Sequence, residues 1–314
     1  MERRVTLAPE ALRRHLAEGV LAFPATPFTA TLALDEAALS RHVADLSAAR
    51  PLALVPAGGA GELFSLSPAE NATVVATTVR GTDGIPVIAG VGGSVAIATE
   101  TARAAERAGA AGVLLLPPYL ITPHQDGLRA YAEQVCRAVG IAVIVYSRDN
   151  GVYAPATVKR LADANANLIG LKDGTGDFET LLTLKRDFGD RLALINGVPT
   201  AEIIARQCFA IGIRAYSSAV FSFLPLLALA FFRAVRDETS AADRLMNEFY
   251  LPLVQLRRRR PGYAVAIIKA GLRAVGKPVG PVRPPLVDLT PPEEEELRML
   301  IARAGDFVDR EIPR

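Results

Sequence analysis

Short apolar runs recur along the first two thirds of the chain, and stretches rich in helix-forming residues separate them. The runs lack polar–apolar alternation, which is typical of parallel strands covered on both faces. They lie at residues 19–24, 52–56, 85–91, 112–116, 141–146, 168–172, 192–195 and 213–217. Eight strand–helix units predict a closed parallel (β/α)8 barrel, the TIM barrel. An open doubly wound sheet is the alternative, but no G-x-G-x-x-G follows the first run, which weakens a dinucleotide-binding interpretation.

Two of the separating stretches carry clear helix-start signals. Asp35 is suited to cap a helix expected at 35–49. Ser67, followed by Pro68 and then by Glu70, predicts a capping box at the start of the next helix. Further helices are expected up to residue 108 and at 125–139, 155–164 and 200–211.

The 314 residues suffice for one large α/β domain, and no linker marks a second one. We expect a barrel over residues 1–233 and a C-terminal helical extension over 234–314. The extension is expected to pack on the barrel or on a neighbouring subunit, as part of a single structural unit. The most apolar segment, 219–232, is shorter than the roughly 20 residues that span a bilayer. It contains Pro225, so we expect a buried helix that begins near this proline and no membrane span.

Composition argues against several classes of function. Lys and Arg number 35 and Asp and Glu 33, a net charge of +2 that argues against a general nucleic-acid binder. The arginine run at 257–260 fits a solvated helix end or a subunit contact better than a nucleic-acid patch. Cys136 and Cys208 lack a C-x-x-C spacing, and the N-terminus lacks the apolar core of a signal peptide, so a reducing, cytoplasmic location is expected. The three histidines form no metal-ligand pattern, and no metal is expected.

A lysine ends the sixth apolar run. In the segment LIGLKDGTG (168–176), Lys172 lies where a buried strand meets a loop. A lysine in such a place is usually either paired or used in chemistry. One interpretation is a structural ion pair with Asp173 or another acid. The other is a nucleophile that forms a Schiff base, because burial lowers the amine pKa from about 10.4 and leaves the amine neutral.

The carboxyl ends of the strands of a TIM barrel meet at one mouth, where the active sites of such barrels lie. Besides Lys172, this rule places there the loop GGAGE at 58–62, Tyr146 after the fifth run, and Ser217 with Ser218 after the eighth. An amine, a phenol, hydroxyls and a loop rich in amides suit carbonyl chemistry. Each also has a structural interpretation: the loop as a tight βα turn, and Tyr146 as an aromatic at the edge of the core.

These residues resemble the dihydrodipicolinate synthase / N-acetylneuraminate lyase family over nearly the whole chain. The glycine-rich loop ending in GE (61–62), Tyr146 and the lysine of GLK (170–172) occur in the order typical of the family. The resemblance implies that Lys172 forms a Schiff base with a 2-oxo acid, that Tyr146 shuttles protons, and that the loop holds the substrate carboxylate. It implies no metal or organic cofactor besides the covalent lysine adduct, and a homotetramer or homodimer.

Finer motifs resemble one branch of this family, which converts 5-dehydro-4-deoxy-D-glucarate to 2,5-dioxopentanoate, water and CO2. They are YSRDN (146–150), NGVPTAE (196–202), YSSAVF (216–221) and PGYAV (261–265). The chain departs from the synthases of the family at three positions: Gly59 and Ala60 replace adjacent hydroxyl residues, and Leu120 replaces a second tyrosine. Carboxylate binding would then depend on backbone N–H groups, which can form an anion-binding nest, and lysine-biosynthesis activity is disfavoured.

A sugar dicarboxylate needs two anion sites. The backbone amides of Gly59, Ala60 and Gly61 are expected to hold the carboxylate next to the imine. The other substrate-binding candidates are Arg148, Asn150, Asn196, Gly197, Ser217 and Ser218. Two other functions stay open: aldolase or dehydratase chemistry on another 2-oxo-3-deoxy sugar acid, and a non-catalytic sugar-acid-binding barrel. Release of CO2 would indicate the conversion to 2,5-dioxopentanoate, and release of pyruvate would indicate an aldolase. Failure to trap a substrate on Lys172 with borohydride would favour the non-catalytic binding protein.

Overall fold

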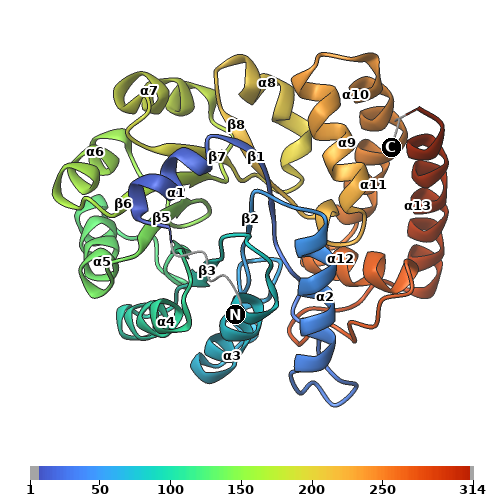
Figure 1. Ribbon diagram of the computed structural model, residues 1–314, viewed down its shortest axis with the longest axis horizontal. Helices are drawn as coiled ribbons and strands as arrows, with labels where there is room; N and C mark the ends of the chain where they lie inside the picture. The colour runs from blue at the N-terminus through green and yellow to red at the C-terminus, as the bar shows by residue number, and fades with distance from the viewer. Residues whose placement is uncertain (1–6, 312–314) are drawn as a thin grey trace.

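The computed structural model describes residues 7–311, in which eight parallel strands form a barrel with helices between them (Figure 1). The strands are β1 Glu18–Ala22, β2 Ala53–Leu54, β3 Ile88–Val91, β4 Gly112–Leu115, β5 Ala142–Ser147, β6 Leu168–Asp173, β7 Ala193–Asn196 and β8 Arg214–Ser218. Neighbours along the sheet follow the order β2-β1-β8-β7-β6-β5-β4-β3. A parallel bridge between Leu54 and Val87 then joins the two edge strands, and the Leu54 amide donates to the Pro86 carbonyl at 3.0 Å. The predicted TIM barrel is confirmed.

Helices connect successive strands and surround the barrel (Figure 1). They are α2 Glu36–Ala48, α3 Pro68–Gly81, α4 Val95–Ala108, α5 Gln125–Ala138, α6 Pro155–Ala164, α7 Phe178–Phe188, α8 Ala205–Ala210 and α9 Pro225–Arg236. The predicted starts are confirmed: Asp35 accepts a hydrogen bond from the Ala38 amide, and Ser67 and Glu70 form the capping box. These side chains pair backbone N–H groups that the first turn of a helix leaves without partners.

The sequence patterns did not indicate two helices, α7 and the N-terminal α1. The second of these, α1, spans Pro9–His15 and packs against β5 and β6. Its Leu12 and the following Leu16 are fully buried in the apolar cluster inside the barrel. Only two apolar residues mark this short helix, so its periodicity is weak. Helix α1 covers the barrel at the amino-terminal ends of the strands. The opening at their carboxyl ends is therefore where we look for an active site.

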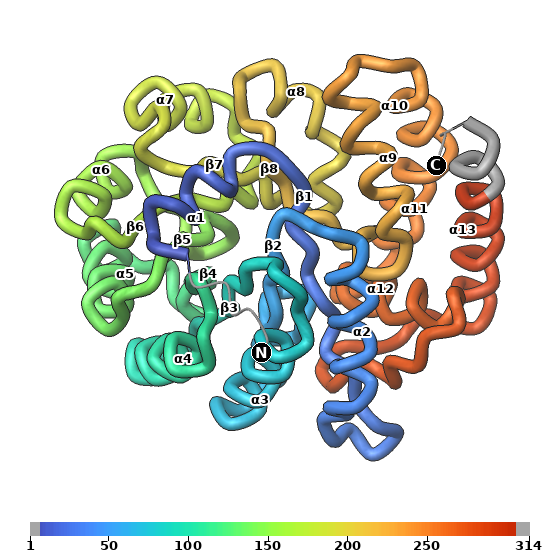
Figure 2. Tube along the Cα trace, in the orientation of Figure 1, coloured from blue at the N-terminus to red at the C-terminus, as the bar shows by residue number. Residues whose placement is uncertain are grey.

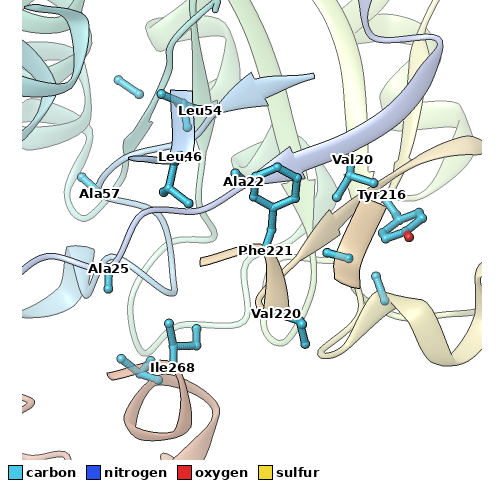
Figure 3. Close-up of a cluster of buried hydrophobic side chains, with 14 of the residues drawn as sticks. Val20, Ala22, Ala25, Leu46, Leu54, Ala57, Tyr216, Val220, Phe221 and Ile268 are labelled. Carbon is cyan, nitrogen blue, oxygen red and sulfur yellow. The ribbon is translucent and has the colours of Figure 1, made fainter. Parts of the chain in front are cut away.

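The strands separate two layers of buried apolar side chains. Leu21 of β1 belongs to the inner layer together with Ile144 and Ile195, whereas Val20 and Ala22 belong to the outer layer beneath the helices. Figure 3 shows part of this outer layer around β1 and β8. Because successive side chains of a strand point to opposite faces and both faces are covered here, the runs contain no polar alternation.

The C-terminal extension lies along one side of the barrel, next to α9 and α2, as the orange and red segments of Figures 1 and 2 show. Its helices are α10 Ser240–Leu245, α11 Leu251–Arg257, α12 Tyr263–Ala274 and α13 Pro291–Glu311, and a π-helical turn at Met246–Tyr250 joins the first two. Helix α9 begins at Pro225 as predicted and continues to Arg236, past the expected boundary at residue 233. Within the described part of the chain, no helix is long and apolar enough to cross a membrane.

A buried ion pair joins the extension to the barrel. Lys269 of α12 and Glu62, in the loop after β2, are both fully buried, with 2.6 Å between Nζ and Oε1. The backbone amide of Arg283 donates to the other Glu62 oxygen at 3.0 Å. Lys269 also donates to the Pro281 carbonyl at 2.7 Å. The Glu62 carboxylate is therefore engaged by the extension at the end of the glycine-rich loop.

Candidate active site

Lys172 extends from β6 into the interior of the barrel. Its Cα is paired with Tyr146 of β5 on one side and with Ile195 of β7 on the other. The side chain is 3% exposed, and its Nζ lies 3.5 Å from the centroid of the Tyr146 ring and 5.3 Å from that of Phe23. The nearest polar partner is the Gly197 carbonyl, to which Nζ donates at 3.2 Å. The amine is thus held among aromatic rings by one neutral acceptor.

Asp173, the neighbour of Lys172, has other partners. Its Oδ1 accepts a hydrogen bond from the Thr175 hydroxyl at 2.8 Å, and its Oδ2 accepts one from the Gly176 amide at 2.8 Å. Among residues 7–305, whose side chains the structure describes, no carboxylate forms an ion pair with Lys172. The ion-pair interpretation of this lysine is therefore wrong, and Asp173 instead shapes the loop that follows β6.

The surroundings of Lys172 favour the neutral amine. Burial lowers its pKa well below the ordinary lysine value, and the positive charge of Arg148 lowers that pKa further. The negative charge of Asp173 acts in the opposite direction but is the smallest of the three effects. A neutral amine is the form that attacks a carbonyl carbon.

Tyr146 and Lys172 share one acceptor. The Tyr146 hydroxyl donates to the Gly197 carbonyl at 2.7 Å and accepts a hydrogen bond from Arg148 Nη1 at 3.0 Å. Burial raises the pKa of the Tyr146 phenol, against a smaller opposing effect of the Arg148 charge. The phenol is therefore protonated at neutral pH, and it lies beside the amine in a position to exchange a proton with a bound substrate.

Two glycines permit this close packing. A Cβ on Gly197 would lie 2.5 Å from both Cγ and Nζ of Lys172. A Cβ on Gly174 would lie 2.7 Å from Cβ of Arg148 and 3.0 Å from the Tyr146 ring. Any larger residue at either position would displace one of the three side chains that form the site.

The loop after β2 presents backbone amides near the same mouth. Within the loop, the Glu62 amide donates to the Gly59 carbonyl and the Leu63 amide to the Gly58 carbonyl, both at 3.2 Å. By contrast, no residue in the described part of the chain accepts a hydrogen bond from the amides of Gly59, Ala60 or Gly61. A Cβ on Gly58 would lie 2.9 Å from the ring of Phe23, whose centroid is 5.3 Å from the Lys172 amine, so this loop and the amine lie near the same ring. Successive free N–H groups of this kind can bind an anion.

Comparison with known proteins places the chain in a family. The dihydrodipicolinate synthetase family matches residues 16–304, nearly the entire described chain. The chain belongs to that family. The match includes every strand of the barrel, the lysine of β6, and α9 to α12.

Relatives within the family extend over almost all of the chain. A protein from Saccharopolyspora erythraea, named probable 5-dehydro-4-deoxyglucarate dehydratase, is 50% identical over 294 residues, which are 93% of this chain and 94% of that relative. A protein of the same name from Rhizobium rhizogenes is 47% identical, with 94% and 98% covered. Among solved structures, dihydrodipicolinate synthase from Bacillus clausii aligns with a TM-score of 0.85 at 25% identity, covering 94% of this chain and 99% of that one. A prophage protein of the family from E. coli K12, solved with pyruvate, aligns with a TM-score of 0.82 at 26% identity, covering 92% and 98%.

Two predicted substrate-binding residues follow β5. Arg148 contacts the Tyr146 hydroxyl, and its Nε pairs with Asp149 at 2.7 Å. The Asn150 side-chain amide donates to the carbonyls of Pro118 and Ile121 at 2.6 and 2.5 Å, which ties it to the loop after β4. Arg148 therefore lies beside the catalytic candidates, while the amide nitrogen of Asn150 holds a neighbouring loop.

Three more predicted residues lie at the ends of β7 and β8. The Asn196 side chain donates to the Ala201 carbonyl at 2.9 Å, within the turn that contains Gly197. Ser217 is half-buried, and the register of β8 places it on the inner face, next to Leu21 of β1. Ser218 points to the outer side, where its hydroxyl donates to Glu202. Of the three, only Ser217 presents its side chain toward the interior.

Sequence reasoning missed Phe23, a residue of the site, and it left two interpretations of the arginine run at 257–260 open. Phe23 directly follows β1 and contributes the second ring near the Lys172 amine, and its place at the end of an apolar run was the available signal. In the arginine run, Arg257 donates to the Thr200 hydroxyl at 2.8 Å, and Arg259 forms two bonds to Glu296 of α13. Both arginines thus stabilise contacts within the chain at the end of α11.

Proposed function

We propose that the protein is a Schiff-base hydro-lyase that converts 5-dehydro-4-deoxy-D-glucarate to 2,5-dioxopentanoate, water and CO2. The observation that carries this proposal is the buried amine of Lys172, which lacks an ion-pair partner in the described chain and lies against Tyr146. The relatives named 5-dehydro-4-deoxyglucarate dehydratase, up to 50% identical, support the choice of substrate. The covalent lysine adduct is the only cofactor that the proposed chemistry requires.

The reaction begins with attack of the Lys172 amine on the C5 ketone of the substrate. Loss of water from the carbinolamine gives a protonated imine, which acts as an electron sink and makes the C4 proton acidic. Removal of that proton expels the C3 hydroxyl and leaves a conjugated iminium. The same sink accepts the electron pair of the C1–C2 bond as CO2 leaves. Protonation and hydrolysis of the imine then release 2,5-dioxopentanoate and free Lys172.

Tyr146 is assigned the proton transfers around the imine carbon. Its hydroxyl is protonated, lies beside the amine and is oriented by Gly197 and Arg148. It can donate a proton to the oxygen that leaves the carbinolamine and recover it during imine hydrolysis. Such a positioned acid–base group contributes roughly 10²- to 10⁴-fold to a rate.

The two carboxylates of the substrate are assigned to opposite ends of the site. The amides of Gly59, Ala60 and Gly61 bind the carboxylate next to the imine, because they lie at the same mouth and have no acceptor in the described chain. Arg148 and Ser217 are the side chains that we assign to the distal polar end. The nitrogen of Asn150 and the side chains of Asn196 and Ser218 already have partners, so we assign them to the support of the neighbouring loops.

The test is incubation of the purified protein with 5-dehydro-4-deoxyglucarate, followed by assays for CO2 and 2,5-dioxopentanoate. Borohydride added during turnover should attach the carbon skeleton of the substrate to Lys172, which peptide mass spectrometry detects. Lys172→Met, which keeps the length and loses the amine, should give neither product nor adduct. Formation of pyruvate instead of CO2 would identify an aldolase, and a folded protein that binds the sugar acid without an adduct would identify a binding protein.

We also propose that the protein is a cytoplasmic homodimer or homotetramer. Tyr119 and Leu120, at the tip of the loop after β4, are 79% and 82% exposed, and Ile121 next to them is 66% exposed. Adjacent exposed apolar side chains of this size favour a contact with another subunit. Light scattering after size-exclusion chromatography measures the assembly directly, and a monomer at micromolar concentration would overturn this assignment.

A further inference from the structure

The Gly197 carbonyl is the one acceptor that holds both the Lys172 amine and the Tyr146 phenol. It belongs to a turn between β7 and a short 3-10 helix at Ala201–Ile204. The Asn196 side chain spans this turn, because it donates to the Ala201 carbonyl and accepts from the Val198 amide at 3.3 Å. The position of the reacting groups therefore depends on how this turn is fixed to the rest of the barrel.

Glu202 fixes the far end of the turn to β8. Its side chain is 1% exposed and accepts a hydrogen bond from the Ser218 hydroxyl. The same hydroxyl accepts one from the Phe221 amide at 3.1 Å, so its only proton is directed at Glu202. The side-chain hydrogen bond that joins the turn to the end of β8 therefore needs an acceptor at position 202.

The place of Glu202 is unfavourable for a carboxyl group. Its second oxygen and the hydroxyls of Tyr216 and Tyr250 are all buried, and none of the three has a hydrogen-bond partner among residues 7–305. Tyr216 extends from β8 with its hydroxyl visible in Figure 3, and Tyr250 lies in the π-helical turn of the extension. Burial raises the pKa of Glu202 to about 7, against smaller effects of the Ser218 hydrogen bond and the Arg257 charge. The burial of Glu202 with a single side-chain partner lowers the stability of the fold, because a buried polar group costs free energy unless it is hydrogen-bonded. The π-helical turn that carries Tyr250 is of a kind that is frequent at functional sites.

Four residues of this cluster have no role in the chemistry at Lys172, although they come from the two motifs that also contain Gly197 and Ser217. Thr200 and Glu202 belong to NGVPTAE, and Tyr216 and Ser218 belong to YSSAVF. Arg257 of the extension adds a second tie, because it donates to the Thr200 hydroxyl at 2.8 Å. The two motifs and the extension therefore meet on the outer side of the barrel, behind the turn that carries Gly197.

We propose that Glu202 is a positioning residue for the Schiff-base reaction, which acts through Ser218 and the 196–202 turn to hold the Gly197 carbonyl under Lys172 and Tyr146. It touches neither substrate nor reacting atoms. The proposal rests on the proposed function for the identity of the reaction. It differs from a purely structural role because the loss of the Glu202–Ser218 bond should slow imine formation and proton transfer while substrate binding at the loop after β2 is kept.

Three variants of the full chain test this proposal. Glu202→Leu removes the acceptor and keeps most of the volume, and we expect kcat to fall between about tenfold and 10²-fold with KM within about twofold. Ser218→Ala, a smaller change, should lower kcat in the same direction. Glu202→Gln keeps a carbonyl oxygen for the Ser218 hydroxyl and should recover most of the loss. The matched control is Glu133→Leu. Glu133 is a buried acid on α5, remote from the turn, and it pairs with Arg129 and Arg137. This variant should have a lower melting temperature and an unchanged kcat.

A second measurement separates this proposal from the proposed function. Pyruvate, a small 2-oxo acid, is trapped on Lys172 with borohydride, and the rate of adduct formation is compared between wild type and Glu202→Leu. If the wild type traps pyruvate but does not convert 5-dehydro-4-deoxyglucarate, the assigned reaction fails while the comparison of trapping rates still tests Glu202. Equal trapping rates and equal kcat in a folded Glu202→Leu protein would overturn the positioning role. So would a Glu202→Gln protein as impaired as Glu202→Leu.

Discussion

Lys172 and Tyr146 obtain their reactivity from the residues that surround them. Burial and a neighbouring positive charge lower the pKa of Lys172, which favours the neutral amine, and burial raises the pKa of Tyr146, which favours the protonated phenol. Arg148 links the two effects, because it donates to the Tyr146 hydroxyl and its charge acts on the Lys172 amine. After burial, the charge of Arg148 is the second cause that lowers the pH at which the nucleophile becomes available.

Arg148→Gln should move the acid limb of the pH profile of kcat/KM to higher pH. The pKa of Lys172 is depressed in the folded protein, so kcat/KM should rise with pH as the amine loses its proton. Removal of the positive charge of Arg148 takes away one cause of that depression, so the apparent pKa of the limb should increase. The measurement is kcat/KM across pH 5 to 9. If the limb stays in place while KM rises, Arg148 binds the distal carboxylate and does not tune the amine.

At the scale of elements, the sequence predicted local features well and non-local contacts poorly. Eight apolar runs, the caps of α2 and α3 and the strand-end position of Lys172 follow from residues close together in the chain. The bond between Ser218 and Glu202 and the pair of Glu62 with Lys269 could not be predicted, because each joins separate elements whose proximity only the closed barrel and its extension create. The same reasoning explains why Ser218 was predicted at the mouth: the register of β8, which directs its side chain outward, depends on pairing with β1 and β7.

Gly197→Ala tests the close contact between the β7 turn and β6. The new Cβ would overlap Lys172 at 2.5 Å, and the lysine side chain or the turn must move by a fraction of an ångström or more. We expect kcat to fall by about 10²-fold or more, because the amine and the phenol would lose their common acceptor. Steady-state kinetics and borohydride trapping measure the loss, and circular dichroism checks the fold. The control is Gly305→Ala in α13, where a Cβ meets nothing within 4 Å, and its kcat should equal that of the wild type.

At the scale of the whole molecule, the extension is part of the structure that supports the active-site loops. Lys269 of α12 pairs with Glu62 at the end of the glycine-rich loop, and Arg257 of α11 holds Thr200 in the turn next to Gly197. Both loops of the proposed site are therefore braced from the same helical extension, on one side of the barrel (Figure 1). This arrangement predicts that barrel and extension unfold together as a single structural unit, with no separate transition for residues beyond α9.

Replacement of the buried Lys269 tests whether its ion pair with Glu62 joins the extension to the barrel. Lys269→Met leaves the Glu62 carboxylate buried without its cation, and the loss of one partner of such a pair costs about 3–5 kcal/mol. The double variant Glu62→Gln with Lys269→Met removes both charges and keeps an acceptor for the Arg283 amide, so it should recover much of that loss. The control is Lys277→Met, whose partly exposed pair with Asp45 should contribute less than about 1 kcal/mol. Urea unfolding followed by circular dichroism and by tyrosine fluorescence, which no tryptophan obscures in this chain, gives the free energies of unfolding. Two separate transitions in the wild type, or an equal effect of the two single variants, would contradict the role of the buried pair in joining the extension to the barrel.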